Sequence, residues 1–171
     1  MGTMQPWHDF FLLTGGAAAT LLGLVFVAAS IAATVPNEKL GDEKSRALWI
    51  LPIVWAFVRV LVISAMGLIP GQTATSFGYL LLVLAVLDLG RMTQTTIGIG
   101  EVHRTRERLP ASDWGWYVFL PIAATLVIGG AGLALAREWP SPSYMLAAGL
   151  LGHLVIGVHN ARELADWLAT R

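Results

Sequence analysis

Hydrophobic residues gather in five long stretches along the chain, and polar residues concentrate in the short segments between them. Each stretch has roughly the 20 residues, or more, that a helix needs to cross about 30 Å of hydrocarbon. Strands of a membrane barrel would show alternating polarity over about 10 residues, which these stretches lack. In lipid every backbone polar group needs an internal partner, so the pattern predicts helices. They are expected at about residues 8–34, 47–69, 77–99, 114–136 and 144–167.

Proline and glycine mark the ends of the predicted helices. Pro36, Pro70-Gly71, Pro110 and Pro140 each fall between consecutive apolar stretches, where a residue that cannot continue a helix is expected. No repeat, low-complexity tract or soluble domain interrupts the pattern. The sequence therefore predicts an all-α, polytopic integral membrane helix bundle in which residues 1–171 form one transmembrane domain.

Composition supports a lipid bilayer as the environment. Hydrophobic residues make up 56% of the 171 residues and charged residues only 13%, whereas soluble domains carry about 25% charged residues. The net charge of zero gives no reason to expect a nucleic-acid partner. The chain contains no cysteine, which excludes disulfides and thiolate chemistry. The first apolar run exceeds the roughly 7–15 residues of a signal-peptide core, so we expect a retained first helix.

Lysine and arginine are distributed unevenly between the two ends of the predicted bundle. One end carries nine, at Lys39, Lys44, Arg46, Arg91, Arg104, Arg106, Arg108, Arg162 and Arg171. The opposite end carries only Arg137. Because cytoplasmic ends carry the excess of basic residues, we expect the N-terminus outside the cytoplasm and the C-terminus inside it. Aromatic side chains fit two interfaces, with Trp7, Trp139 and Tyr144 outside and Trp49, Trp114, Trp116 and Trp167 inside.

Three ionisable residues are expected near the bilayer midplane. Arg59 lies near the centre of the second predicted helix, about 15–18 Å from either end at 1.5 Å per residue. Asp88 on the third helix and His153 on the fifth reach a similar depth. An arginine at this depth costs at least about 2.5–3.5 kcal/mol, so it needs a partner or water. The sequence therefore predicts a central cluster of Arg59, Asp88 and His153.

Further polar residues extend this cluster toward the cytoplasmic end. Arg91 follows Asp88 by three positions, which places both on one helix face. Asn160 and Glu163 follow His153 on the last helix. Beyond the third span, Glu101 to Arg108 is expected to prolong the helix into the cytoplasm. Its basic residues mark topology or meet anionic lipid head groups.

Two interpretations of this intramembrane polar cluster remain open at the level of sequence. In the structural one, Arg59–Asp88 and Arg91–Glu163 are buried ion pairs that fix helix order, and His153 is a satisfied core residue. In the functional one, the same residues line a path for an ion, a proton or a small solute. Charged residues inside membranes commonly mark such paths, but pairing alone is a sufficient reason for them.

Small and hydroxyl residues repeat along one side of the first predicted helix. The set comprises Gly15, Gly16, Ala19, Thr20, Gly23 and Ser30. Small residues let helix backbones approach closely, and hydroxyl groups can bond across the contact. The stripe therefore predicts helix packing, either within the chain or between copies in a homo-oligomer; pore lining is the alternative.

Motifs of known catalytic or metal sites are scarce. The chain has no H-E-x-x-H, G-x-S-x-G or P-loop pattern. His159 and Glu163 have i,i+4 spacing, but two ligands on one helix are too few for a metal site. We therefore expect no catalytic residues, metal or cofactor. A membrane enzyme that acts on a lipid through the central cluster is the weakest of the hypotheses.

The start of the chain resembles a group of small bacterial polytopic membrane proteins of uncharacterised function. The similarity rests on Trp7-His8-Asp9-Phe10-Phe11, on Gly15-Gly16-Ala17-Ala18-Ala19 and on Leu22-Gly23-Leu24-Val25-Phe26-Val27-Ala28. These segments follow a shared pattern W-x-D-F-F, G-A-A-A and G-L-x-F-V-A, and the similarity covers about the first 30 residues. It implies a protein of the bacterial cytoplasmic (inner) membrane and no particular activity.

The sequence favours two functions. The first is an oligomeric channel or transporter for a small ion or solute, as the central cluster and the small-residue stripe indicate. The second is a non-transporting structural or regulatory membrane protein that acts through a membrane-protein partner. Both place the chain in a lipid bilayer.

Overall fold

The structure is a computed structural model, and it describes residues 5–34, 43–105, 111–139 and 142–169. The helices are α1 (His8–Thr34), α2 (Glu43–Gly67), α3 (Ala74–Thr105), α4 (Ala111–Trp114), α5 (Leu120–Ala136) and α6 (Pro142–Ala169). Within the described residues no strand is present. The prediction of an all-α helix bundle is confirmed. Among the basic residues that indicate orientation, Lys39, Arg106, Arg108 and Arg171 lie outside the described residues.

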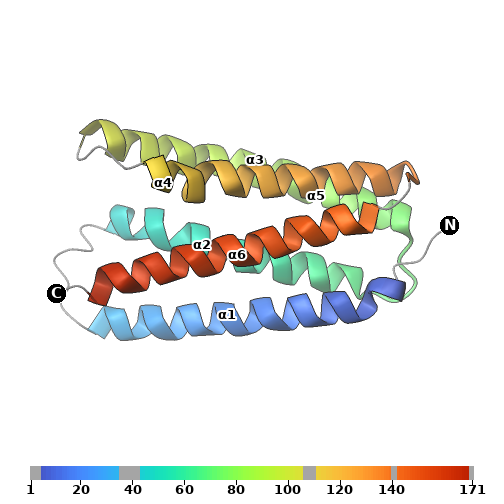
Figure 1. The fold of residues 1–171 in the computed structure, drawn as a ribbon, viewed down its shortest axis with the longest axis horizontal. Helices are drawn as coiled ribbons and strands as arrows, with labels where there is room; N and C mark the ends of the chain where they lie inside the picture. Colours follow the sequence, from blue (N-terminus) through green and yellow to red (C-terminus); the bar gives the residue numbers. More distant parts are fainter. Residues whose placement is uncertain (1–4, 35–42, 106–110, 140–141, 170–171) are drawn as a thin grey trace.

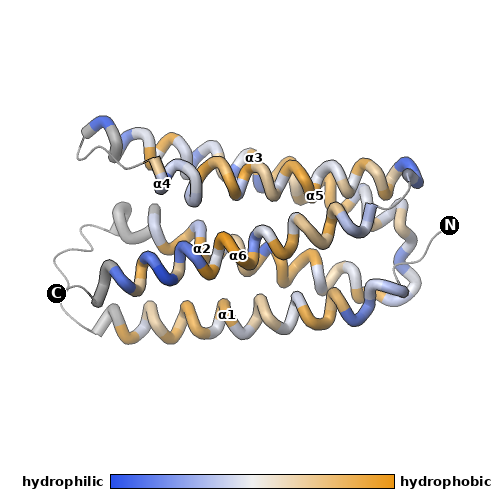
Figure 2. Tube along the Cα trace, viewed as in Figure 1, coloured by the Kyte–Doolittle hydropathy of each residue, from blue (hydrophilic) through white to orange (hydrophobic). Residues whose placement is uncertain are grey.

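Five spans are long and apolar enough to cross a membrane. They are His8–Ile31, Trp49–Gly67, Ala74–Glu101, Ala111–Ala136 and Pro142–Asp166. Large apolar side chains face outward along them, for example Leu13, Val86 and Ile97, each about 70% exposed. Figure 2 shows this hydrophobic colouring along the length of the helices. Such a surface is unfavourable in water and suited to lipid tails, so the architecture is that of an integral membrane protein.

The fourth span contains a π-helical turn, η3 (Gly115–Phe119), between α4 and α5. The backbone N–H of Leu120 donates to the carbonyl of Gly115, five residues earlier. Pro121 follows at once and has no N–H of its own, so it cannot continue the regular pattern of hydrogen bonds. The wider turn keeps the helix continuous at this point. The span therefore runs unbroken from Ala111 to Ala136, as the apolar stretch predicts.

The helices run alternately up and down, and α6 lies at the centre of the arrangement (Figure 1). It packs against α5 and α2 and touches α1. The remaining large contacts join α3 to α5 and α1 to α2. The consecutive helices α2 and α3 share a much smaller contact than either of these pairs. Polar interactions between α2 and α3 therefore matter more for their relative placement.

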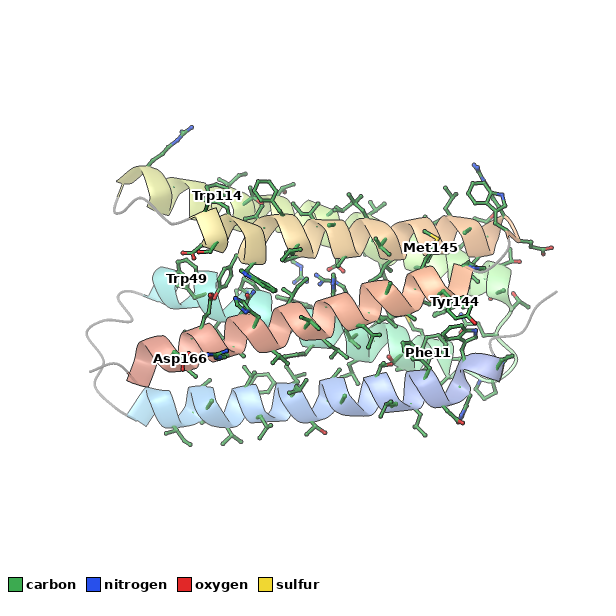
Figure 3. All side chains as sticks on the ribbon, in the orientation of Figure 1. Phe11, Trp49, Trp114, Tyr144, Met145 and Asp166 are labelled. Carbon is green, nitrogen blue, oxygen red and sulfur yellow. The ribbon has the colours of Figure 1, made fainter. Side chains whose placement is uncertain are left out.

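The two ends of the bundle each carry an aromatic cluster. The rings of Trp7 and Tyr144 lie 5.1 Å apart, edge to face, where α1 and α6 begin. At the opposite end, the rings of Trp49 and Tyr117 lie 5.0 Å apart. Figure 3 shows Tyr144 at one end and Trp49 with Trp114 at the other. The side chain of Trp167, also expected at an interface, lies outside the description.

Glycine permits the close contact between α3 and α5. A Cβ atom on Gly78 would lie 2.6 Å from the carbonyl oxygen of Gly132 and 2.6 Å from the backbone nitrogen of Ala136. Both atoms belong to the backbone and have little freedom to move aside. Small residues at a helix crossing are a common way to pack membrane helices. The α3–α5 contact therefore depends on the missing side chain at Gly78.

Gly78→Ala should destabilise the bundle by about 1–3 kcal/mol, because the added methyl group overpacks a backbone crossing. Gly90→Ala is the matched control on the same helix, since a Cβ there would meet nothing within 4 Å. Unfolding of the purified protein in mixed detergent micelles measures both. Equal losses of unfolding free energy in the two variants would contradict a close α3–α5 contact at Gly78.

Candidate functional site

The candidate site centres on an ion pair between α2 and α3. Arg59 Nε donates to Asp88 Oδ2, and the two side chains are only 8% and 15% exposed. The two residues therefore contact each other, as the predicted cluster requires. A buried charge without a partner costs several kcal/mol, so the pair ties together two helices that share little else.

Arg91 joins the same carboxylate from one turn further along α3. Its Nη2 lies 3.5 Å from Asp88 Oδ1, and its guanidinium carbon lies 3.2 Å from the ring centroid of Trp55. A guanidinium over an indole ring is stabilised by the ring's negative face. Trp55 lies one turn before Arg59 on α2. Helix α2 therefore supplies both the Arg59 guanidinium and the ring that supports Arg91. The sequence does not mark Trp55 as part of the site, because aromatic residues at this depth usually indicate packing.

The expected Arg91–Glu163 ion pair is wrong. Arg91 pairs with Asp88, whereas Glu163 Oε1 lies 3.0 Å from His159 Nε2 on its own helix. Glu163 is ten residues beyond His153 on α6, or about 15 Å along the axis. The glutamate therefore lies too far toward the helix end to meet Arg91.

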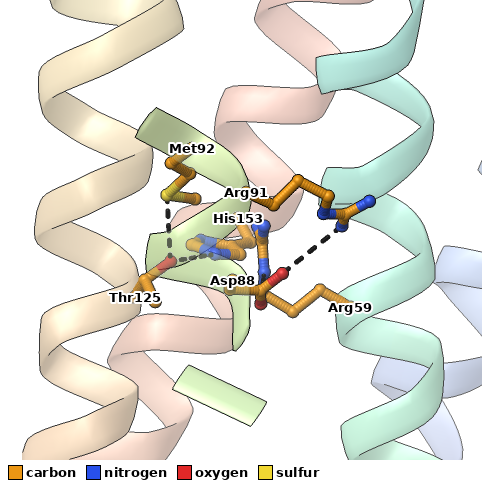
Figure 4. Close-up of polar contacts among 6 residues, drawn as sticks. All are labelled: Arg59, Asp88, Arg91, Met92, Thr125 and His153. Atoms are coloured by element: carbon orange, nitrogen blue, oxygen red, sulfur yellow. Dashed lines mark hydrogen bonds and ion pairs between the residues drawn. The ribbon is translucent and has the colours of Figure 1, made fainter. Parts of the chain in front are cut away.

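His153 lies in the same region of the core and is 1% exposed. Its Nε2 lies 3.3 Å from Thr125 Oγ1, which also lies 3.8 Å from Met92 Sδ, so the single hydroxyl proton of Thr125 can go to either neighbour. The other ring nitrogen, Nδ1, is buried without a hydrogen-bond partner in the described part of the chain. Figure 4 shows the ring between Thr125 and the Arg59–Asp88 pair. His153 is therefore not the fully satisfied core histidine of the structural interpretation.

Two turns further along α6, Asn160 repeats this situation. Its Nδ2 donates to the carbonyl of Trp116 at 3.4 Å, while its Oδ1 is buried and has no partner among the described residues. The neighbouring His159 ring stacks on Trp116 at a centroid distance of 3.6 Å. Buried polar atoms without partners are rare, and water is a common explanation for them. Helix α6 thus presents two such atoms, from the centre toward one end.

The small residues of α1 divide between two environments. Gly15 is buried, and a Cβ on it would lie 3.0 Å from Ser64 Cβ on α2. Gly16 and Gly23 would meet nothing within 4 Å. Ala19, Thr20 and Ser30 are exposed as well, and the two hydroxyl groups donate to backbone carbonyls of their own helix. Packing within the chain therefore uses Gly15 alone of the predicted stripe.

Metal binding has little support in this arrangement. No group of three or more His, Asp or Glu side chains is arranged to hold a metal ion among the described residues. The acidic and histidine side chains that do meet form separate pairs, such as His159 with Glu163. The chemistry available is therefore that of guanidinium, carboxylate, imidazole and amide groups at a buried site.

Comparison with known proteins adds no family to these observations: no family model, curated protein or solved structure matches the chain. The resemblance of the first helix to small bacterial membrane proteins stays a prediction. The case for a site therefore rests on the geometry described above.

Asp88→Leu should destabilise the bundle by about 3–5 kcal/mol, because it leaves Arg59 buried without a counter-charge. Arg59→Met should cost less, since Asp88 keeps Arg91 as a partner. The double variant Arg59→Met/Asp88→Leu should be more stable than Asp88→Leu alone. Denaturation in mixed detergent micelles gives the three free energies of unfolding, and strictly additive losses would refute this coupling.

Proposed function

We propose that this protein forms or gates a path for a small ion or solute across the membrane. The observation that carries the proposal is a run of polar side chains inside the bundle. It begins at the Arg59–Asp88 pair and continues along α6 through the buried His153 and Asn160. A purely structural ion pair explains Arg59 and Asp88, but it gives no reason for the unpartnered atoms on α6.

A water molecule or a polar solute would provide hydrogen-bond partners for those two atoms. His153 Nδ1 and Asn160 Oδ1 lie about 10 Å apart along one face of α6, from the seven-residue spacing and 1.5 Å per residue. Neither has a hydrogen-bond partner within the described ranges, and a passing water or polar solute can supply one. Intramembrane polar groups that face the bundle interior are frequent features of ion and proton paths. The two atoms therefore favour transport over a closed core.

Flux into liposomes tests this proposal. Purified wild-type protein should raise the leak of small ions above that of empty liposomes, and Arg59→Ala or Asp88→Asn should change it several-fold. Arg137→Gln is the matched control, because Arg137 lies exposed at the far end of α5. Equal background leak from the wild type and both cluster variants would refute transport through this cluster.

We also propose a bacterial inner membrane location with the N-terminus outside and the C-terminus in the cytoplasm. The support is the excess of lysine and arginine at the end where α1, α3 and α6 finish. The start of α1 and the end of α6 lie at opposite ends of the bundle (Figure 1), as an N-out, C-in arrangement requires.

Single cysteines can be placed without background, because the chain has none. In intact spheroplasts, a membrane-impermeant maleimide should label Glu138→Cys and not Arg104→Cys, both of which replace exposed side chains. Lysis should make both react. The reverse pattern in intact spheroplasts would invert the proposed orientation.

A second candidate is a structural or regulatory role through a protein partner in the membrane, and the outer face of α1 favours it. Gly16, Ala19, Thr20 and Gly23 face away from the rest of the chain. No described residue of α1 after Ala18 is buried. Small residues of this kind suit contact with another membrane helix, so this face is where we expect a second copy or a partner.

A cysteine at Gly23 should form a disulfide with a second copy in native membranes if α1 mediates self-association. A cysteine at Leu13, an exposed residue of the same helix outside the small-residue stripe, is the matched control. Gel mobility under oxidising conditions measures the dimer fraction. Equal dimer fractions from the two positions would exclude the stripe as a specific interface.

A further inference from the structure

The charges in the central cluster do not balance. Arg59 and Arg91 both pair with the single carboxylate of Asp88. Two positive groups against one negative group leave a net charge of +1. Glu163, which lies nearer the end of α6, is already paired with His159. An uncompensated charge at this depth is costly unless water or an anion neutralises it.

The two guanidinium groups retain donors for a further ligand. Arg59 reaches Asp88 through Nε, so its two terminal Nη groups are not needed for that hydrogen bond. Arg91 makes only a long contact of 3.5 Å to the carboxylate, and its side chain is 33% exposed. It is therefore both the more weakly bound and the more accessible of the two cations.

His153 supplies an independent sign of a missing ligand. It is 1% exposed, and its Nδ1 has no partner among the described residues. Thr125 has one hydroxyl proton, and the imidazole Nε2 is a stronger acceptor for it than the Met92 thioether. We therefore assign that proton to the Thr125–His153 hydrogen bond, which leaves the ring proton on Nδ1. In that tautomer Nδ1 is a donor, in the same region as the two arginines (Figure 4).

We propose that Arg59, Arg91 and His153 bind a small monovalent anion at the centre of the bundle. The anion neutralises the excess positive charge and accepts hydrogen bonds from guanidinium and imidazole groups. A lipid phosphate does not fit, because Arg91 lies ten residues before Glu101 on α3, or about 15 Å from the end of that span. This inference rests on the proposed function and names the class of solute as anionic.

Trp55 provides a local probe, because its ring lies against the Arg91 guanidinium. Iodide quenches tryptophan fluorescence on contact, so it can be titrated into purified protein at constant ionic strength with gluconate as the bulky replacement anion. Subtraction of the Trp55→Phe signal isolates the Trp55 response. Wild-type protein should show saturable quenching that chloride competes away. Acrylamide, a neutral quencher, reports changes in exposure alone.

Variants at Arg91 and Asp88 test the charge argument. Arg91→Gln should weaken iodide binding by at least about tenfold, equivalent to 1.4 kcal/mol, and Arg91→Lys should retain most of it. Asp88→Asn should strengthen binding, because it removes the competing negative charge. Arg162→Gln is the control for loss of a positive charge, since that side chain is 79% exposed. Both Arg91 variants leave the Arg59–Asp88 pair in place, so they report on binding even when Asp88→Asn fails to fold.

Linear, non-saturable quenching that is equal in wild-type and Arg91→Gln protein would overturn the anion site. Weaker binding in a folded Asp88→Asn variant would also overturn it. The flux measurement separates this result from the proposed function. Saturable binding without flux would refute transport and support the anion site. Flux that does not change when gluconate replaces chloride, together with non-saturable quenching, would refute the anion site and support transport of another solute.

Discussion

A charge placed in hydrocarbon needs an opposite charge or water, and much of this bundle's arrangement follows from how Arg59 meets that need. Asp88 provides the opposite charge from α3. The contact between α2 and α3 is otherwise small, since α3 packs chiefly on α5 and α2 packs on α1 and α6. Helix α6 packs on both α5 and α2, and the ion pair adds a direct polar link between α2 and α3, at a depth where a charge without a counter-charge is least tolerated.

The need for a counter-charge is not fully met within the cluster. Arg91 adds a second positive charge to the one carboxylate, with Trp55 as additional support for its guanidinium. His153 lies nearby, and its buried Nδ1 has no partner in the part of the chain that the structure describes. A purely structural pair would need neither residue. The central cluster is therefore better explained as a site that binds water or a solute than as a purely structural contact between helices.

Helix α1 serves two environments with one repeated pattern. Gly15 and Ala18 face α2 and the core, while Gly16, Ala19 and Gly23 face outward. Close packing explains the first group, because Gly15 approaches Ser64 closely. Gly16, Ala19 and Gly23 are exposed, and no contact with the described residues requires a small side chain at Gly16 or Gly23. Lipid tolerates that face, and another helix would use it better.

The sequence by itself determined the helical class, the five spans and the common depth of Arg59 and Asp88, because hydrocarbon thickness and the rise per residue fix these quantities locally. Helix neighbours are not fixed in this way. Only the tertiary structure decided that Arg91 pairs with Asp88 and lies on Trp55 and that Glu163 turns to His159. Rotation of each helix about its axis decides such contacts. In a bundle with apolar residues on every side, packing sets that rotation, and the hydrophobic pattern leaves it open.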